Sequence, residues 1–142
     1  MPKSDEKWTW QCDQVIHNDT AVGGRLLEDV LSQLESLHWG HREIFGVHLA
    51  VHEALVNAID HGNASNGSKH VRFSCRISPE KIHVEITDEG PGFDPDSIPD
   101  PTTPARLCCP GGRGVLLMRT FMSRVEFRNN GNHVVLEKER PK

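Results

Sequence analysis

The feature that most constrains the fold is a change of hydrophobic period near the middle of the chain. Before the change, apolar residues recur at helical spacing over residues 20–38 and again over residues 43–61. After it, apolar and polar residues alternate over residues 71–77 and 82–87, which a Ser-Pro-Glu turn separates. The sequence therefore predicts two helices followed by an antiparallel hairpin with one apolar face and one polar face.

Weaker signals of the same kinds flank this unit. Alternation of Trp and Cys with polar residues predicts a strand over residues 8–16. A helical pattern predicts a third helix over residues 113–124. Two more strands follow, one beginning at Val125 and one containing Val134 and Leu136, with an Asn-Asn-Gly-Asn turn between them.

Capping and breaking residues divide the chain between these elements. Asp19 or Thr20 can cap the first helix, Gly40 is expected to end it, and Gly62 is expected to end the second helix. Residues 91–112 contain six of the nine prolines and have no periodicity, which predicts a long loop. A loop of this length in a compact domain is usually functional, often as a lid.

Together these elements predict an α+β fold in two layers. Three helices would cover one face of a mixed, mostly antiparallel sheet of about five strands, and the other face would meet water. A doubly wound sheet is excluded because alternating strands cannot be buried on both faces. The length of 142 residues suits one domain over residues 1–142, with its core over about residues 8–140.

Charge and hydropathy exclude several classes of function. The net charge of −4 argues against direct binding of nucleic acid, because neutralising phosphates needs a surplus of Lys and Arg. No apolar run approaches the roughly 20 residues of a membrane span, and the N-terminus has no signal-peptide pattern. The four cysteines form no C-x-x-C pair and are expected to be free thiols in a reducing cytosol. Composition thus indicates a cytoplasmic protein.

The most informative segment is the end of the second helix, HEALVNAIDHGN. Glu53, Asn57 and Asp60 are spaced i, i+4 and i+7, and at about 100° per residue the first two lie on nearly one line beside the apolar stripe. One interpretation is a solvated polar edge. The other is a site in which Glu53 acts as a base beside a carbonyl oxygen of Asn57 that faces Mg²⁺. The helix alone leaves both open.

A zinc site on the same helix is a weaker hypothesis. His52 and Glu53 begin an H-E-x-x-H pattern, but Val56 stands where the second His is needed. His48 and His52 are one turn apart, yet the sequence offers no obvious third ligand. Zinc is therefore not expected.

The hairpin ends in a glycine-bearing segment. Asp88 stands at the end of the predicted strand, and Gly90 and Gly92 follow it as D-x-G-x-G. Glycine lets the backbone approach a ligand closely. Because Asp and Gly are also common turn residues, this segment alone is equally compatible with a plain turn.

A second glycine-bearing segment, GGRGVLLMRTF, opens the third helix. Gly111, Gly112 and Gly114 surround Arg113 there. Free N–H groups at a helix N-terminus bind phosphate, and the arginine adds positive charge. The segment is not a Walker loop, because the G-x-x-x-x-G-K-[ST] pattern is absent.

Taken in order, these parts resemble a known family. They are similar to the ATP-binding domain shared by gyrase, Hsp90, histidine kinases and MutL, and within it to the bacterial anti-sigma-factor serine kinases. HEALVNAIDHGN resembles the N-box of that branch, DEGPGFDP its first glycine box and GGRGVLLMRTFMSRVEF its second. The resemblance runs over about residues 10–140 and implies the Bergerat-type ATPase fold.

The resemblance implies a role for each motif residue. Glu53 would be the catalytic base, Asn57 would hold Mg²⁺, and Asp88 would accept a hydrogen bond from the adenine amino group. Residues 93–112 would form the ATP lid. The residues expected to bind ATP are Asn57, Asp60, His61, Asp88, Gly90, Gly92, Gly112, Arg113 and Gly114.

The implied activity is that of an ATP- and Mg²⁺-binding anti-sigma factor that phosphorylates a serine or threonine of an anti-anti-sigma partner. A sigma factor would be the other partner, and a homodimer is compatible with both the resemblance and the Trp-bearing first strand. Two alternatives remain. One is a nucleotide-regulated partner-binding module without kinase activity, and the other is a detached histidine-kinase catalytic domain.

The chain departs from the family's pattern at three places. Cys109 stands in the lid near the position where many relatives have an arginine. Ser123 and Arg124 replace an acidic pair that is often found there. Asn132 stands where a threonine is common near the adenine.

Overall fold

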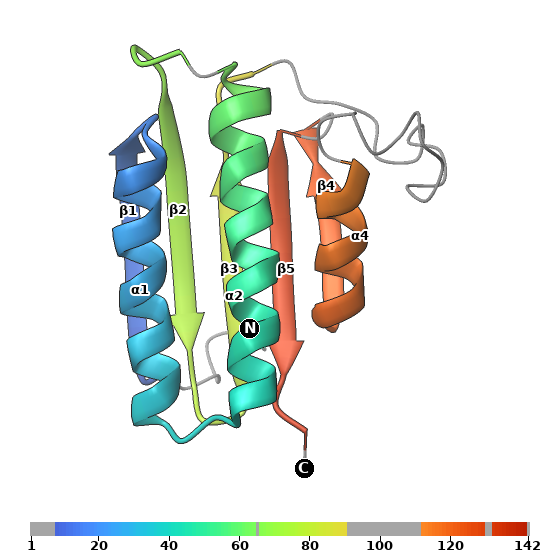
Figure 1. The fold of residues 1–142 in the computed structure, drawn as a ribbon. Coiled ribbons are helices and arrows are strands. Elements are labelled where there is room, and N and C mark those ends of the chain that lie inside the picture. Colours follow the sequence, from blue (N-terminus) through green and yellow to red (C-terminus); the bar gives the residue numbers. More distant parts are fainter. Residues whose placement is uncertain (1–7, 65, 91–111, 130–131, 142) are drawn as a thin grey trace.

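The computed structural model describes residues 8–64, 66–90, 112–129 and 132–141. They form two layers, in which helices cover one face of a five-stranded sheet (Figure 1). The predicted two-layer α+β fold is confirmed. The alternating segments pair with one another in the sheet, and the segments of helical period lie across them.

Every strand pairing among the described residues is antiparallel. In spatial order the strands are β1 (Trp10–His17), β2 (His70–Ile77), β3 (Lys81–Thr87), β5 (His133–Glu139) and β4 (Arg124–Arg128). Strand β5 therefore lies between β3 and β4. Because Thr87 pairs with His133, the end of β3 and the start of β5 lie at the same edge of the sheet.

The boundary between the two long helices differs from the prediction. Helix α1 (Thr20–Ser36) ends before Gly40, and Gly40 is instead the N-cap of helix α2 (His41–Val56). His38 makes the turn with a φ of 60°, a left-handed conformation that is uncommon for residues other than glycine. Since His38 supplies that conformation, the expectation that Gly40 ends α1 was wrong.

The helical winding changes at the end of α2. The chain continues as a π-helix, η2 (Asn57–Gly62), and the Asn63 N–H donates to the Ala58 carbonyl at 2.9 Å, an i→i+5 bond. The helical prediction through residue 61 was right, but residues 57–62 wind as a π-helix and do not continue the α-helical period. Such π-turns are frequent at functional sites.

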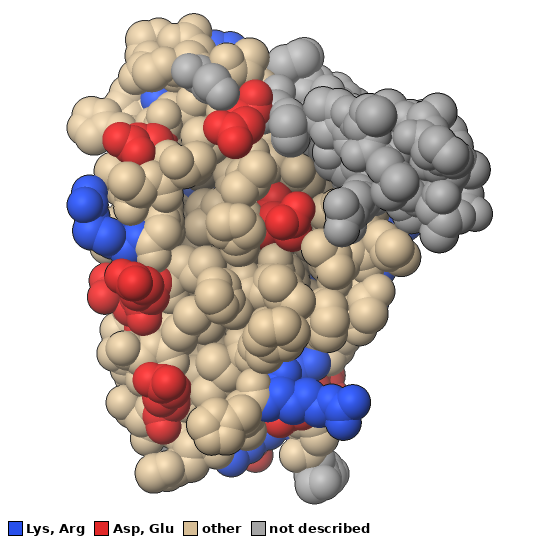
Figure 2. Space-filling model, viewed as in Figure 1, with Lys and Arg blue, Asp and Glu red and all other residues tan. Residues whose placement is uncertain are grey.

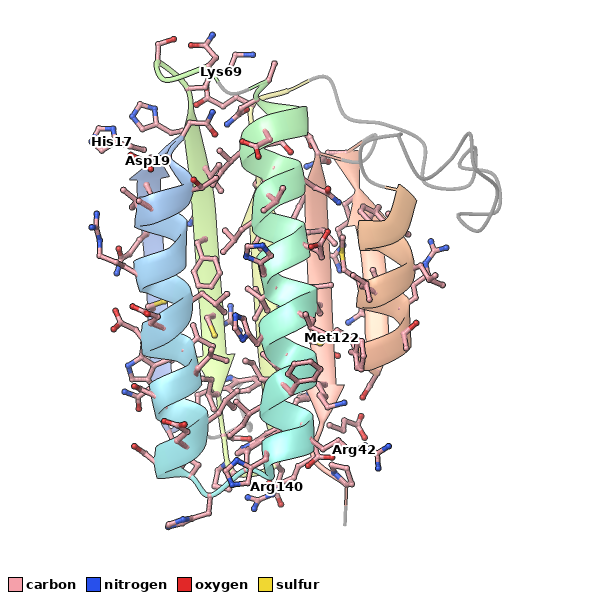
Figure 3. All side chains as sticks on the ribbon, in the orientation of Figure 1. His17, Asp19, Arg42, Lys69, Met122 and Arg140 are labelled. Carbon is pink, nitrogen blue, oxygen red and sulfur yellow. The ribbon has the colours of Figure 1, made fainter. Side chains whose placement is uncertain are left out.

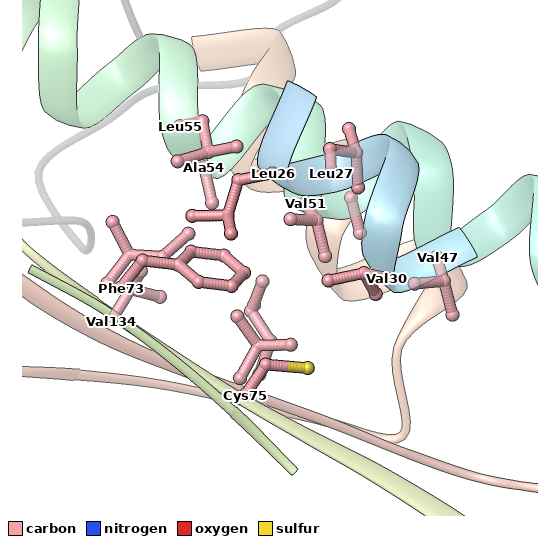
Figure 4. Packing of buried hydrophobic residues seen from close by; sticks show 14 of the residues in the cluster. Leu26, Leu27, Val30, Val47, Val51, Ala54, Leu55, Phe73, Cys75 and Val134 are labelled. Atoms are coloured by element: carbon pink, nitrogen blue, oxygen red, sulfur yellow. The ribbon is translucent and has the colours of Figure 1, made fainter. Parts of the chain in front are cut away.

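The apolar core lies between the sheet and the helices. Phe73 of β2 is fully buried and projects beneath Leu26 and Ala54 (Figure 4). Val51 of α2 is also fully buried, as its place in the apolar stripe predicts. Each such side chain contributes roughly 1.5–3 kcal/mol by leaving water. This packing fixes α2 over the middle of the sheet.

The other face of the sheet carries a set of ion pairs. His83 Nδ1 lies 2.6 Å from Glu137 Oε2, and His83 Nε2 lies 2.8 Å from Glu85 Oε2. His133 Nε2 lies 2.8 Å from the other oxygen of Glu85, and Arg124 Nη1 lies 3.4 Å from Glu137 Oε1. We call these five residues the open-face network. The His83 side chain is only 9% exposed, so the expectation that this face simply meets water was too coarse.

The network lowers the pKa values of its carboxyl groups. Burial by itself raises the pKa of Glu85, but hydrogen bonds and charge from His83 and His133 outweigh it and leave that pKa below its ordinary value of 4.5. Burial likewise raises the pKa of Glu137, and His83 and Arg124 help to lower it below 4.5. The network is therefore most favourable when both carboxyl groups are ionised.

The two ends of the molecule carry different groups. Arg42 and Arg140 lie at the end opposite Lys69 (Figure 3). There the Arg140 guanidinium donates to the carbonyl oxygens of Leu37 at 3.1 Å and Pro79 at 3.2 Å, which ties the C-terminal segment to two turns. Between the ends, the surface along α2 is largely uncharged (Figure 2). No helix in the described ranges is long and apolar enough to cross a membrane.

Candidate functional site

Glu53 and Asn57 face the first turn of helix α4 (Gly112–Phe121). A Cβ on Gly114 would lie 3.0 Å from Glu53 Oε1 and 3.2 Å from Asn57 Nδ2. A larger residue at this position would push α4 away from the carboxylate and the amide. Gly114 thus lets the N–H groups at the start of α4 approach both side chains.

Asn57 contains a buried polar atom without a hydrogen-bond partner. Its Nδ2 is shielded from solvent and bonds to no group in the described part of the chain. Leaving a buried N–H unpaired costs roughly 1–3 kcal/mol, which a bound ligand can offset. A half-turn of the amide exchanges its two atoms, so this position can donate to a phosphate oxygen or present a carbonyl oxygen to a metal ion.

Asn132 contains a second atom of this kind. Its Oδ1 is buried without a partner, although its Nδ2 donates to the Gly90 carbonyl at 3.1 Å. The Asn132 carbonyl also accepts from the Asp88 N–H at 2.9 Å. Within the described ranges, Asn57 and Asn132 supply the two buried side-chain atoms that lack a partner. Both belong to segments that the sequence assigns to the site.

Asp88 packs against the end of η2. A Cβ on Gly62 would lie 2.3 Å from Asp88 Oδ2, and a Cβ on Gly90 would lie 1.8 Å from the Gly62 carbonyl oxygen. The Gly90 N–H donates to Asp88 Oδ1 at 2.7 Å. Both glycines are therefore needed for close approach, although the sequence indicated Gly62 only as a helix end.

The surroundings of Asp88 are only partly polar. Burial raises the pKa of the Asp88 carboxyl, while the Gly90 N–H and the charge of Lys69 act in the opposite direction. A carboxyl group in such a place can accept a hydrogen bond from a neutral donor at low cost in hydration, because it has already lost part of its water shell. An amino group on an aromatic base is a donor of this kind.

Residues 88–90, which we call the DEG segment, are held from three sides. The Glu89 N–H donates to Asn63 Oδ1 at 2.7 Å, and Glu89 Oε2 accepts from the His70 N–H at 2.6 Å. Asn132 bonds the segment from the start of β5. The roles of Asn63 and His70 could not be predicted, because Gly-Asn after a helix is equally typical of a plain helix end.

The remaining predicted residues fall into two groups. Asp60 and His61 lie in η2, and Gly112 and Arg113 lie in the first turn of α4. Three predictions concern positions outside the described residues. These are Gly92, Cys109 and the expected lid over residues 93–112, of which only residue 112 is described.

The metal hypotheses differ in how well they fit. His48 and His52 are exposed and contact each other edge to face with ring centroids 6.5 Å apart. The described residues contain no group of three His, Cys, Asp or Glu side chains that could hold a metal ion. Mg²⁺ bound to a nucleotide needs less, because it takes one or two protein oxygens and completes its shell with phosphates and water. The buried Asn57 amide beside Glu53 fits that requirement.

Comparison with known proteins places this chain in a family. The family described as "Histidine kinase-like ATPase domain" matches residues 21–138. Serine/threonine-protein kinase BtrW of Bordetella bronchiseptica is 29% identical, with 83% of this chain and 89% of that protein covered. The anti-sigma F factor of Clostridium beijerinckii is 33% identical, with 68% and 71% covered, and serine-protein kinase RsbW of Bacillus subtilis is 33% identical, with 66% and 62% covered.

A solved structure has the same fold. The crystal structure of the RsbU and RsbW domains of Rv1364c from Mycobacterium tuberculosis superposes with a TM-score of 0.61 at 11% identity. The match covers 93% of this chain and 32% of that one. At this identity the likeness concerns the fold alone.

Proposed function

Because the chain belongs to the histidine kinase-like ATPase domain family, we propose that it binds ATP with Mg²⁺ and phosphorylates a serine or threonine of an anti-anti-sigma partner. We propose further that it sequesters a sigma factor. The names of its relatives, serine/threonine-protein kinase, serine-protein kinase and anti-sigma F factor, support both activities. Residues 1–142 would act as one ATP-binding domain, located in the cytoplasm where a sigma factor works.

One observation is the main support for the proposed nucleotide site. The two buried side-chain atoms without a partner in the described ranges, Asn57 Nδ2 and Asn132 Oδ1, lie at the two ends of the candidate site. The first lies beside the start of α4, where phosphates would bind, and the second beside the DEG segment, where the base would bind. A ligand with a polar group at each end would satisfy both atoms.

At the phosphate end, the residues would position the acceptor hydroxyl and the phosphates and would polarise them. Glu53 would accept the proton of the acceptor hydroxyl as that oxygen attacks the terminal phosphorus of ATP. The bond from that phosphorus to the bridging oxygen would break, and ADP would leave. Gly112, Arg113 and Gly114 would bind phosphate oxygens through N–H groups and the guanidinium charge. Mg²⁺, when bound, would neutralise phosphate charge. Asn57 would be its protein ligand, through the carbonyl oxygen of the amide.

At the base end, Asp88 would accept a hydrogen bond from the adenine amino group. Gly90 and Gly92 would let the backbone approach the ring, and Asp60 and His61 would border the site from η2. This arrangement favours adenine over bases with a carbonyl oxygen at the same position, because two acceptors would then face each other without a proton between them.

The test is a paired measurement on Glu53→Gln. This change keeps the shape of the side chain and removes the base, so we expect nearly unchanged Mg-ATP affinity by calorimetry. Single-turnover phosphorylation of a partner isolated by pull-down with ATP should slow by roughly 10²–10⁴-fold. Glu28→Gln on the exposed side of α1 is the matched control and should change neither quantity.

Three outcomes would change the proposal. If wild-type protein binds ATP but transfers no phosphate to any bound partner, the chain is a nucleotide-regulated binding module. If the modified residue is acid-labile and alkali-stable, the acceptor is histidine and the chain is a histidine-kinase catalytic domain. If Glu53→Gln transfers as fast as wild type, the base lies elsewhere. Sedimentation with and without nucleotide tests the homodimer that the family resemblance favours.

A further inference from the structure

Asn63 is fully buried beside the site, and its side chain forms three hydrogen bonds. Its Nδ2 donates to Asn18 Oδ1 at 3.1 Å and to the His70 carbonyl at 2.9 Å. Its Oδ1 accepts from the Glu89 N–H at 2.7 Å. One side chain therefore joins the ends of β1 and β2 to the DEG segment.

The backbone of Asn63 adds a fourth connection. Its N–H closes the last π-turn on the Ala58 carbonyl at 2.9 Å, so the residue is rigidly attached to the helix that carries Glu53 and Asn57. Asn18 strengthens the same attachment, because its Nδ2 donates to the Ile59 carbonyl at 3.2 Å. The two asparagines thus connect η2 to the segment that bears Asp88.

The position of the Asp88 carboxyl depends on this connection. The carboxyl lies against Gly62, the residue next to Asn63, and it is bonded to Gly90 within the same segment. A shift of Glu89 relative to η2 would move Asp88 along the surface of Gly62. Recognition of the base by a hydrogen bond therefore depends on where the Asp88 carboxyl lies, because N–H···O bonds need a distance of about 2.7–3.2 Å and a nearly linear angle.

We propose that Asn63 is a positioning residue for base selection, which fixes the Asp88 carboxyl at the distance from the N-box helix that the adenine amino group requires. This inference rests on the proposed function. Asn63 is fully buried among protein groups and would touch neither base nor phosphate. Its removal should therefore alter which base is chosen more than it alters binding of the triphosphate.

The experiment compares ATP with inosine triphosphate, which has a carbonyl oxygen in place of the amino group and a proton on the neighbouring ring nitrogen. Wild-type protein should prefer ATP by roughly tenfold to a hundredfold in calorimetry. In Asn63→Ala the preference should fall below about threefold, mainly through weaker ATP binding. Asn18→Ala removes one bond to Asn63 and leaves the bond to Glu89, so its preference should be intermediate.

The matched control is Trp39→Phe at the opposite end of the molecule. It removes a buried hydrogen bond from Trp39 Nε1 to the Ser78 carbonyl and should lower stability while leaving the preference for ATP unchanged. If Asn63→Ala weakens both nucleotides in parallel, Asn63 is merely structural and the inference is wrong. If that variant does not fold, an unchanged preference in Asn18→Ala overturns the inference.

Failure of the proposed function would look different. Wild-type protein that binds both nucleotides equally would remove Asp88 from base selection, and the role of Asn63 with it, while ATP binding would stand. Wild-type protein that binds neither nucleotide would overturn the proposed function itself.

Discussion

The open-face network and the DEG segment both involve polar residues at β3, but their polar groups differ in whether they have partners within the protein. In the network, both ring nitrogens of His83 face carboxylates. Each carboxylate has a second nitrogen partner, His133 for Glu85 and Arg124 for Glu137. In the DEG segment, the three backbone N–H groups are paired, yet the adjacent Asn132 Oδ1 is buried without a partner among the described residues. The difference separates groups that stabilise the fold from groups whose partner is a ligand.

Gly90→Ala should have the largest effect, because it breaks the DEG segment. The new Cβ would lie 1.8 Å from the Gly62 carbonyl oxygen, which is backbone and cannot rotate away. We expect a loss of about 3 kcal/mol in the free energy of unfolding, together with loss of ATP binding. Urea denaturation and calorimetry measure the two effects.

Gly67→Ala is the control for that change, because a Cβ at Gly67 would have no atom within 4 Å. Its free energy of unfolding should stay within about 0.5 kcal/mol of wild type. Equal effects of the two substitutions would show that close packing at Gly90 does not hold the DEG segment.

His83→Ala should have the next largest effect, because it breaks the network. It leaves Glu85 and Glu137 without their shared partner, in side chains that are 27% and 18% exposed. Removing the partner of a fully buried charge costs roughly 3–5 kcal/mol, and partial exposure reduces this to about 2 kcal/mol. ATP affinity should not change, since the network lies on the face away from the helices.

Arg72→Ala on the same face is the comparison. It removes an exposed pair with Asp13, at 2.9 Å, and should alter urea denaturation less than His83→Ala does. A weaker effect of His83→Ala, or a fall in its ATP affinity, would contradict the separation of the two regions.

Lowering the pH should weaken the network and reduce the free energy of unfolding by less than His83→Ala does. The pKa values of Glu85 and Glu137 are below 4.5 in the folded protein, so between those values and 4.5 the unfolded chain binds more protons. This part of the stability is therefore fully present above pH 4.5 and is lost as the pH falls through the folded values. Urea denaturation from pH 7 to pH 3 should show a shallower decline in Glu137→Gln than in wild type. Parallel curves would exclude Glu137 as a contributor.

Asn57→Ala should have the smallest effect on folding. It removes a buried N–H that has no partner in the described part of the chain, so the free energy of unfolding should stay within about 0.5 kcal/mol of wild type or rise. Mg-ATP affinity should nevertheless fall by at least tenfold. Denaturation without ligand and calorimetry with Mg-ATP test the two halves, and a large loss of stability would place Asn57 with the groups that hold the fold.

The sequence predicted what depends on local patterns. The period of apolar residues indicated the helices and strands, and Asp19 caps α1 as expected, with its Oδ1 accepting from the Ala21 N–H at 2.8 Å. The motif residues Glu53, Asn57 and Gly114 converge because they lie on faces that the helical period defines.

What could not be predicted depends on contacts between distant segments. A sequence does not reveal that Asn63 bonds Glu89, 26 residues away, or that His83 lies between two carboxylates. The turn at His38 was missed because a left-handed residue is usually glycine, and tertiary contacts override that preference. The roles of the site residues remain predictions.

The π-turn over Asn57–Gly62 constrains the length of the chain as well as its shape. Residues after it lie on a face that a continuous α-helix would turn away, since one residue corresponds to about 100° of rotation. Loss or gain of a single residue between Asn57 and Asn63 would therefore carry Gly62 off Asp88. Natural variation in length should be excluded from this segment and be tolerated in the exposed turn around Gly67, which has open space beside it.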